Sequence, residues 1–99
     1  KNEKNLFAKS SNFISSLTGK PENFVMIKLS DSLPMYFAGT DELCAFIEIK
    51  SIGSLDPPKM SKPIFEFFST ELEIPTERIY VFFQDVVSNQ WAWNSRTFG

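Results

Sequence analysis

The spacing of apolar residues along the chain predicts two helices. Between Glu3 and Thr18 the apolar residues recur at intervals of three, four, seven and eight, which places them on one helical stripe: Leu6, Phe7, Phe13, Ile14 and Leu17. Gly19 follows and is a favourable left-handed end for that helix. The second helix is predicted from roughly Ser61 to Glu73, with Pro63 in its first turn and a stripe of Ile64, Phe65, Phe68 and Leu72.

Segments with strand character alternate with these helices. Residues 24–29 (FVMIKL) and 79–86 (IYVFFQDV) are apolar runs of strand length. Residues 35–39 and 91–98 are predicted to be short extended pieces. Residues 44–52 alternate regularly, which predicts a strand with two faces: Cys44, Phe46, Glu48, Lys50 and Ile52 on one, and Ala45, Ile47, Ile49 and Ser51 on the other.

The chain also contains an internal repeat. With an offset of 55 residues, Leu17 meets Leu72 and Glu22 meets Glu77, so that each helix end leads into a strand after the same number of residues. The second copy reads as strand, helix, strand, whereas the first copy has only the helix and the strand. By the logic of the repeat, we expect a further strand before Lys1 that is missing from the sequence.

These elements predict an α/β (α+β) fold built from a duplicated β-α-β unit. We expect one domain, residues 1–99, with a four-stranded mixed sheet, two helices on one face of it and short extra strands at its edges. The other face of such a sheet is bare and apolar, which soluble monomers seldom tolerate. The pattern therefore predicts oligomerisation through the sheet.

Composition and charge exclude several classes of function. The chain carries 10 Lys and Arg against 12 Asp and Glu, a formal charge of −2, which argues against nucleic acid as a partner. The β-α-β-β-α-β order also occurs in RNA-recognition modules, but their basic, aromatic strand is absent. Without histidine and with a single cysteine, Cys44, the usual zinc sites cannot form, so we expect no metal and no cofactor. We expect no insertion into a membrane, because the apolar runs are short.

Five stretches in register resemble the family of macrophage migration inhibitory factor and D-dopachrome tautomerase, within the tautomerase superfamily. They cover almost the whole chain and read GKPENFVMIKL (19–29), MYFAGTDELCAF (35–46), KSIG (50–53), PTERIYVFFQD (75–85) and WAWNSRTFG (91–99). The resemblance implies the tautomerase fold, a homotrimer with pockets at the subunit interfaces, and keto–enol tautomerase activity on phenylpyruvate- or dopachrome-type substrates.

The resemblance also implies a catalytic base that this sequence does not contain. In the family the base is a proline at the amino terminus of the first strand. A secondary amine in an apolar pocket has a lowered pKa and can accept a proton from carbon. Because the strand that would carry this proline is missing before Lys1, no catalytic residue is present in residues 1–99. Whether the protein is an enzyme thus depends on its true amino terminus.

The same resemblance implies roles for substrate-binding residues. Lys20 of the GKP motif would bind the substrate carboxylate, although a lysine after a helix also suits the helix dipole. The Ile52 backbone N–H, next to Ser51, would donate to the same carboxylate, although a strand end followed by a turn glycine has the same sequence. Four aromatic residues would complete the pocket: Phe24, Tyr80, Trp93 and Phe98.

Several positions depart from the family pattern. Phe82 stands where several animal relatives carry a pocket asparagine, so a hydrogen-bond donor is lost. Phe24 stands where some relatives carry tyrosine. Cys44-Ala45-Phe46-Ile47 retains only the first cysteine of a C-x-x-C motif, which does not support thiol–disulfide oxidoreductase activity.

A second class of function follows from the same resemblance. The protein could be a cytokine-like signalling protein that binds a cell-surface receptor of the invariant-chain type without catalysis. Its location would then be outside the cell, reached without a signal peptide, whereas a tautomerase could also work in the cytoplasm. In both cases the small-molecule partner implied by the pocket is an aromatic 2-keto acid or its enol.

Overall fold

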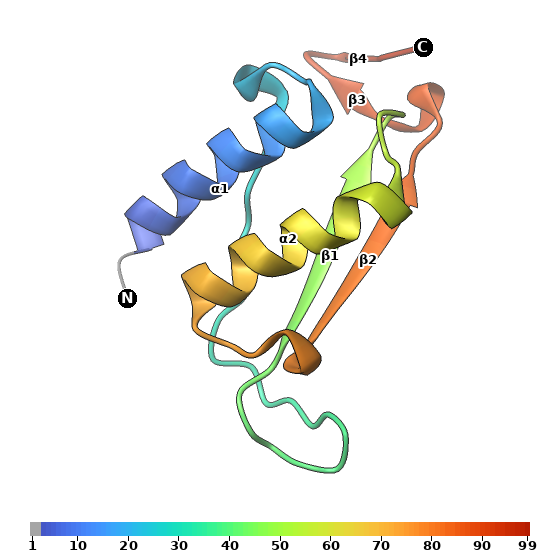
Figure 1. Ribbon diagram of the computed structural model, residues 1–99. Coiled ribbons are helices and arrows are strands. Elements are labelled where there is room, and N and C mark those ends of the chain that lie inside the picture. The colour runs from blue at the N-terminus through green and yellow to red at the C-terminus, as the bar shows by residue number, and fades with distance from the viewer. Residues whose placement is uncertain (1–2) are drawn as a thin grey trace. The chain divides into compact units, whose positions relative to one another are not determined.

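The computed structural model describes residues 3–99, which divide into two compact units. The first unit ends at Glu42 and the second begins at Leu43. Figure 1 shows the elements along the chain, from α1 near the amino terminus to β4 near the carboxyl terminus.

The first unit is dominated by the helix α1, Glu3–Thr18, in agreement with the prediction. Gly19 ends it with φ at +75°, and the Gly19 N–H donates to the Ser15 carbonyl oxygen at 2.9 Å. A left-handed residue is needed to turn the chain out of the helix, which glycine adopts without a steric penalty. The short 3-10 helix η1, Glu22–Phe24, follows directly.

The strand predicted at residues 24–29 is not present among the described residues. Val25 is extended, with φ −99° and ψ 127°, and burial alternates as in a strand, with Val25 and Ile27 half-buried and Met26 and Lys28 exposed. However, none of these residues belongs to either hydrogen-bonded sheet. An extended segment becomes a strand only when its backbone groups pair with a neighbour, and side-chain alternation cannot reveal whether that neighbour is there.

The predicted extended piece at 35–39 is also wrong in part, because the chain turns within it. Phe37 and Thr40 form an isolated antiparallel bridge, with N–H to carbonyl distances of 2.9 and 3.1 Å. Between them Ala38 and Gly39 have φ of +54° and +81°. Two successive left-handed residues are typical of the tight two-residue hairpin turn.

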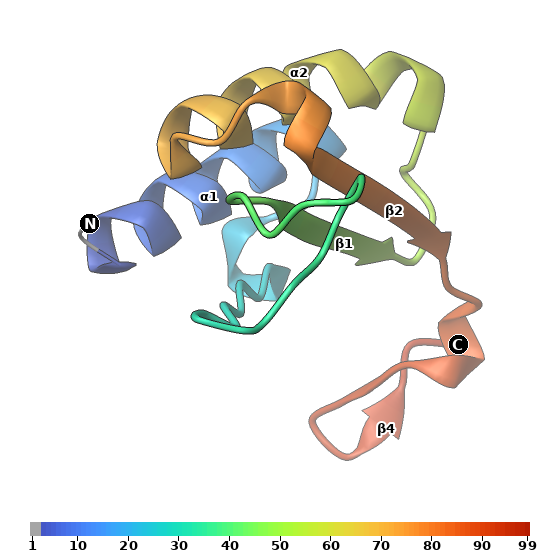
Figure 2. The ribbon, with the colours of Figure 1, turned by 90° about the horizontal axis from the view of Figure 1, so that it is seen from below.

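The second unit contains the complete β-α-β motif. Strand β1, Ala45–Ser51, pairs in parallel with strand β2, Ile79–Asp85, from Ala45 beside Ile79 to Ser51 beside Asp85. Helix α2, Pro57–Leu72, makes the crossover and lies over one face of the pair, as Figures 1 and 2 show. The 3-10 helix η2, Thr76–Arg78, connects α2 to β2.

Helix α2 begins earlier than predicted. Pro57 and Pro58 occupy its first turn, where a missing N–H costs nothing because no intrahelical partner exists there. The Asp56 carbonyl oxygen accepts from the N–H groups of Lys59 and Met60 at 3.0 and 2.9 Å. Pro63 therefore lies inside the helix and not in its first turn, so the placement from sequence was four residues late.

The two faces of the β1–β2 pair differ as the alternation predicted. Ile49 and Ile79 are buried on the face under α2, and Ile64 of α2 is completely buried. On the opposite face Phe46, Tyr80 and Phe82 are 55%, 62% and 47% exposed. We call this set, which includes the register pair Phe46 and Tyr80, the open sheet face.

The chain ends in a small hairpin where one extended stretch was predicted. The 3-10 helix η3, Ser88–Gln90, leads into β3, Ala92–Trp93, which pairs antiparallel with β4, Arg96–Thr97. The turn residues Asn94 and Ser95 have φ of +53° and +76°, the same conformation as the turn after Phe37.

The repeat is confirmed, but its offset is 54 residues and not 55. Helix α1 and helix α2 have matching bounds, since Glu3 and Thr18 correspond to Pro57 and Leu72. The 3-10 helices η1 and η2 match with the same shift. The offset from sequence aligned Leu17 with Leu72, whereas the backbone aligns the prolines that precede each 3-10 helix: Pro21 has φ −61° and ψ 144°, and Pro75 has φ −59° and ψ 146°.

The links between helix and 3-10 helix repeat in detail. The Ser15 hydroxyl donates to the Lys20 carbonyl oxygen at 2.6 Å, and Ser69 donates to the Ile74 carbonyl oxygen at the same distance. Glu73, the counterpart of Gly19, is also left-handed, with φ at +58°.

The predicted four-stranded sheet is not formed by the described residues, which contain two two-stranded sheets, β1–β2 and β3–β4. The strand expected before Lys1 lies outside the described residues.

Candidate functional site

The carboxyl ends of β1 and β2 are linked by a network of hydrogen bonds. Ser51 and Asp85 are register partners at the last position of the two strands. The Val86 N–H donates to the Ser51 carbonyl oxygen at 2.8 Å, so the pairing continues one residue beyond β2. Loops at the carboxyl ends of parallel strands are where ligands commonly bind in α/β sheets.

Side chains from both strands hold the turn after β1. The Ser51 hydroxyl donates to the Gly53 carbonyl oxygen at 2.7 Å, and the Gly53 N–H donates to Asp85 Oδ1 at 2.8 Å. Gly53 has φ at +72°, a conformation that other residues adopt only with strain. Ile52 is therefore held between two anchored residues, and the direction of its backbone is fixed from both sides.

Asp85 was not identified from the sequence as part of the site. A signal was present, because Asp85 ends an apolar strand that pairs in parallel with the strand ending at Ser51. Carboxylates at such positions commonly accept hydrogen bonds from the neighbouring loop. The register between the strands was needed to see that its partner is the Gly53 N–H.

Tyr80 and Phe82 lie on the open sheet face. Tyr80 stands beside Phe46 and Phe82 stands beside Glu48 in the parallel register. The rings of Tyr80 and Phe82 are about half exposed within this chain. Both side chains are thus presented outward, away from the face that α2 covers.

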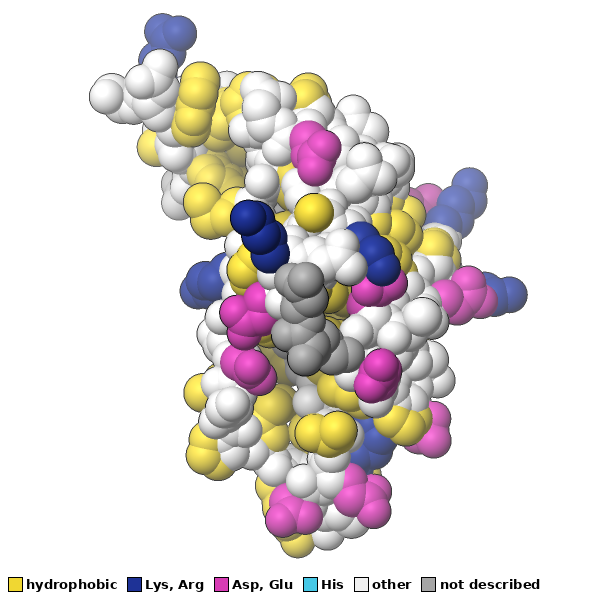
Figure 3. Space-filling view, turned by 90° about the vertical axis from the view of Figure 1, so that its left-hand side faces the viewer, with side chains coloured by type: hydrophobic (Ala, Val, Ile, Leu, Met, Phe, Trp, Pro, Cys, Tyr) yellow, Lys and Arg dark blue, Asp and Glu magenta, His cyan; other side chains and the backbone are white. Residues whose placement is uncertain are grey.

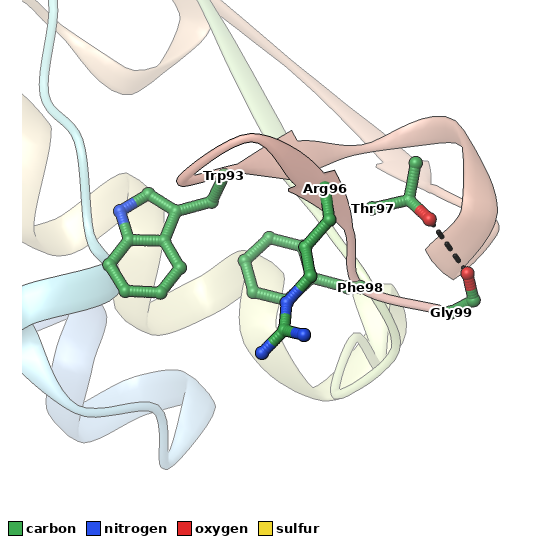
Figure 4. A pocket seen from close by; sticks show the side chains of 5 residues that line it. All are labelled: Trp93, Arg96, Thr97, Phe98 and Gly99. Atoms are coloured by element: carbon green, nitrogen blue, oxygen red, sulfur yellow. Dashed lines mark hydrogen bonds between the residues drawn. The ribbon is translucent and has the colours of Figure 1, made fainter.

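The β3–β4 hairpin brings Trp93 and Phe98 together. Their ring centroids are 6.4 Å apart and their planes differ by 9°, which is a stacked arrangement. They line a shallow, open pocket with Arg96, Thr97 and Gly99, shown in Figure 4. The Phe98 N–H donates to the Trp91 carbonyl oxygen at 3.0 Å, so the hairpin holds the Phe98 backbone in place.

Lys20 and Phe24 lie in the first unit. Lys20 is half-buried directly after Gly19, and its carbonyl oxygen accepts from the Ser15 hydroxyl. The Lys20 N–H contacts Thr18 Oγ1 at 3.4 Å. Phe24 is the last residue of η1 and is 47% exposed. The backbone of Lys20 is thus held by side chains of the preceding helix, Ser15 and Thr18.

Six of the eight predicted site residues therefore fall into three groups. Ser51 and Ile52 belong to the strand-end network, Tyr80 and Phe82 to the open sheet face, and Trp93 and Phe98 to the hairpin. All three groups lie in the second unit, whereas Lys20 and Phe24 lie in the first. Sequence reasoning missed Asp85 and also Arg96, the cation of the hairpin pocket.

Within residues 3–99 no group of three or more Cys, Asp or Glu side chains is arranged to hold a metal ion. None of the helices in the described part of the chain is long and apolar enough to span a bilayer.

Comparison with known proteins identifies the class to which this fold and these motifs belong. Residues 2–99 match the family model described as macrophage migration inhibitory factor (MIF). A macrophage migration inhibitory factor homolog from Brugia malayi is 34% identical over 94 residues, which are 92% of this chain and 82% of that protein. The chain therefore belongs to the macrophage migration inhibitory factor family.

Solved structures agree on the fold. The macrophage migration inhibitory factor homologue from Prochlorococcus marinus superimposes with a TM-score of 0.91 at 38% identity, covering 97% of this chain and 87% of that one. Leishmania major MIF2 gives a TM-score of 0.80 at 36% identity, covering 97% and 84%. The α+β class and the tautomerase fold predicted from the sequence are thus confirmed.

Proposed function

We propose that the protein is a keto–enol tautomerase of phenylpyruvate- or dopachrome-type substrates. The observation that carries the proposal is the strand-end network, in which Ser51 and Asp85 hold the Ile52–Gly53 turn from both sides. A rigid backbone turn at the end of parallel strands is a suitable place for N–H groups that bind a carboxylate. Membership of the family supports the assignment.

The described residues would contribute binding and orientation. Lys20 and the Ile52 backbone N–H would bind the carboxylate of a 2-keto acid, and charge-assisted hydrogen bonds of this kind are the strong ones. The aromatic residues would hold the substrate ring: Phe24, Tyr80, Phe82, Trp93 and Phe98. Holding the acid in one orientation sets C3, the carbon between the keto group and the ring, toward a base, which is a large part of the catalysis of proton transfer.

The base itself would be an amino-terminal proline, as in the family, and this sequence does not contain it. The roles assigned to residues 1–99 are thus substrate binding and orientation, with no catalytic residue among them. To form the enol, a proton would pass from C3 to the base and then to the enolate oxygen. In the reverse direction the base would take the proton from the enol oxygen and return it to C3, so the two forms have the same composition.

We further propose that the protein works as a homotrimer. The open sheet face exposes the large apolar side chains of Phe46, Tyr80 and Phe82. Apolar side chains also reach the surface between charged ones in the view of Figure 3. Because large apolar areas on soluble proteins usually mark contact surfaces, covering this face with neighbouring subunits would stabilise the assembly and place Tyr80 at a subunit interface.

A cytokine-like role is the second candidate. Relatives from Mus musculus and Xenopus tropicalis are named macrophage migration inhibitory factor, each 28% identical over 88 residues. In this role the trimer surface would bind a cell-surface receptor of the invariant-chain type, outside the cell and without turnover. Catalysis and receptor binding can coexist in one protein.

The experiment begins with the protein purified from its natural source. Its intact mass and amino-terminal sequence are measured first, and the rate of phenylpyruvate enol–keto conversion is then compared with buffer alone. An amino-terminal proline together with conversion well above buffer supports the tautomerase. A free proline with no conversion above buffer contradicts it and favours the receptor-binding role.

A further inference from the structure

The hairpin pocket contains a cation that none of the roles above uses. Arg96 of β4 is the register partner of Trp93 in β3. Directly paired residues of an antiparallel ladder project on the same face, and residues two apart on one strand also share a face. Figure 4 shows the side chains of Trp93, Arg96 and Phe98 on the same side of the hairpin.

The rings of Trp93 and Phe98 are nearly parallel and both are partly exposed, so both are accessible to a ligand. Their planes are within 9° of parallel, and the Trp93 and Phe98 side chains are 57% and 45% exposed. Arg96 is exposed beside them and forms no ion pair within residues 3–99. Exposed aromatic faces bind flat apolar rings, and a guanidinium binds carboxylate with two parallel hydrogen bonds.

The hairpin is also held in shape independently of these three side chains. The Thr97 hydroxyl donates to the Gly99 carbonyl oxygen at 2.7 Å. A side chain added at Gly99 would meet the Ser88 side chain, with Ser88 Cβ only 2.9 Å away, so the end of the chain packs closely on η3. A change at Arg96 is therefore expected to alter the charge of the pocket and to leave its backbone intact.

From this geometry we propose that Arg96 binds an anionic group carried on the substrate ring. The preferred substrates are then aromatic 2-keto acids with a second acidic group on the ring. The inference rests on the proposed function, in which Lys20 and Ile52 bind the keto-acid carboxylate. Arg96 would be a specificity-determining residue for the second charge.

The first test measures selectivity in turnover. With the protein carrying its natural amino terminus, kcat/KM is measured for 4-carboxyphenylpyruvate and for phenylpyruvate. We expect Arg96→Gln to lower the ratio of kcat/KM for 4-carboxyphenylpyruvate to kcat/KM for phenylpyruvate about fivefold. This is the size of effect typical of an exposed ion pair. Arg96→Lys, which retains the charge but loses the two parallel hydrogen bonds, is expected to lower the ratio less than Arg96→Gln does. Lys62→Gln, which removes an equal charge from the exposed face of α2, is expected to leave it unchanged. An unchanged ratio in Arg96→Gln, or an equal fall for both substrates, overturns the proposal.

The second test needs no turnover and so separates the two proposals. The Trp93 indole N–H signal is followed by NMR during titration with 4-carboxyphenylacetate and with phenylacetate, and Trp91→Phe assigns it. Arg96→Gln is expected to weaken binding of the dianion about fivefold at low salt and of the monoanion less than twofold. If Arg96→Gln weakens dianion binding in this way but the native protein does not enolise phenylpyruvate, the role of Arg96 is supported and the proposed tautomerase activity is contradicted. Equal binding of both probes to the native protein and to Arg96→Gln overturns the role of Arg96 whatever the turnover.

Discussion

Ser10 and Ile64 occupy the same position in the two copies of the repeat, 54 residues apart. Both are buried completely, with 1% and 0% of their surface exposed. Ile64 fills its place with an apolar side chain, whereas the Ser10 hydroxyl has no hydrogen-bond partner among the described residues. A buried hydroxyl without a partner is destabilising because it has lost its hydrogen bonds to water.

Replacing that hydroxyl with hydrogen should therefore stabilise the protein. We expect Ser10→Ala to raise the free energy of unfolding by about 1 kcal/mol, since the desolvated oxygen is removed at little change in volume. The midpoint and slope of urea denaturation measure this change.

Ser16→Ala is the matched control, because Ser16 is exposed on the same helix and the substitution changes helix propensity equally. The gain for Ser10→Ala should exceed the gain for Ser16→Ala. Equal gains at the two positions would show that the buried hydroxyl has no penalty.

Ser15 and Ser69 form equivalent hydrogen bonds but should differ in function. Each substitution to alanine removes one hydroxyl-to-carbonyl bond and is expected to destabilise the protein by about 1 kcal/mol. Only Ser15 holds the carbonyl of a proposed ligand residue, Lys20. Ser15→Ala should therefore raise KM for phenylpyruvate severalfold while Ser69→Ala leaves it near the native value; equal KM values in the two variants would remove Ser15 from the site.

The acceptor at Asp85 should matter more than its charge. Asp85→Ala removes the acceptor of the Gly53 N–H and loosens the Ile52–Gly53 turn, whereas Asp85→Asn retains a carbonyl oxygen at Oδ1. We expect Asp85→Ala to raise KM for phenylpyruvate about fivefold and Asp85→Asn to raise it less than twofold. Steady-state kinetics of both variants decide this, and identical kinetic constants would mean that the turn does not orient the substrate.

A charge on the open sheet face should prevent assembly. Phe82→Glu places a carboxylate where the proposed trimer buries an apolar ring, and burial of an unpaired charge is strongly unfavourable. We expect sedimentation velocity to show a trimer for the native protein and monomers for Phe82→Glu. Thr70→Glu, which adds the same charge at an exposed position of α2, should remain trimeric; dissociation of both variants, or of neither, would argue against an interface at Phe82.

The sequence allowed prediction of those elements that depend on local patterns. Helix α1 was predicted at its observed bounds because its stripe is regular and Gly19 ends it. The two faces of β1 followed from its alternation. Helix α2 was predicted too late, because Pro63 was placed in the first turn, which Pro57 and Pro58 occupy instead.

Features that depend on pairing between distant segments could not be predicted in this way. The alternation of residues 24–29 gives no information on whether a neighbour pairs with them. The two-residue turns at Ala38–Gly39 and Asn94–Ser95 lack the usual Asn-Gly sequence, so both hairpins were read as extended. Asp85 could be assigned to the site only once its pairing with Ser51 was known, and Arg96 only once its pairing with Trp93 was known.

The most direct test of the central claim is kcat/KM for phenylpyruvate in the native protein, in Lys20→Gln and in Lys28→Gln, each with its natural amino terminus. Lys28 is an exposed lysine of the same unit, so its substitution changes the net charge equally. Because a charge-assisted hydrogen bond to the substrate is worth about 1.5–3 kcal/mol, we expect Lys20→Gln to lose about 10- to 100-fold and Lys28→Gln to lose less than twofold. Equal kcat/KM for Lys20→Gln and Lys28→Gln, or no turnover above buffer by the native protein, would contradict the claim.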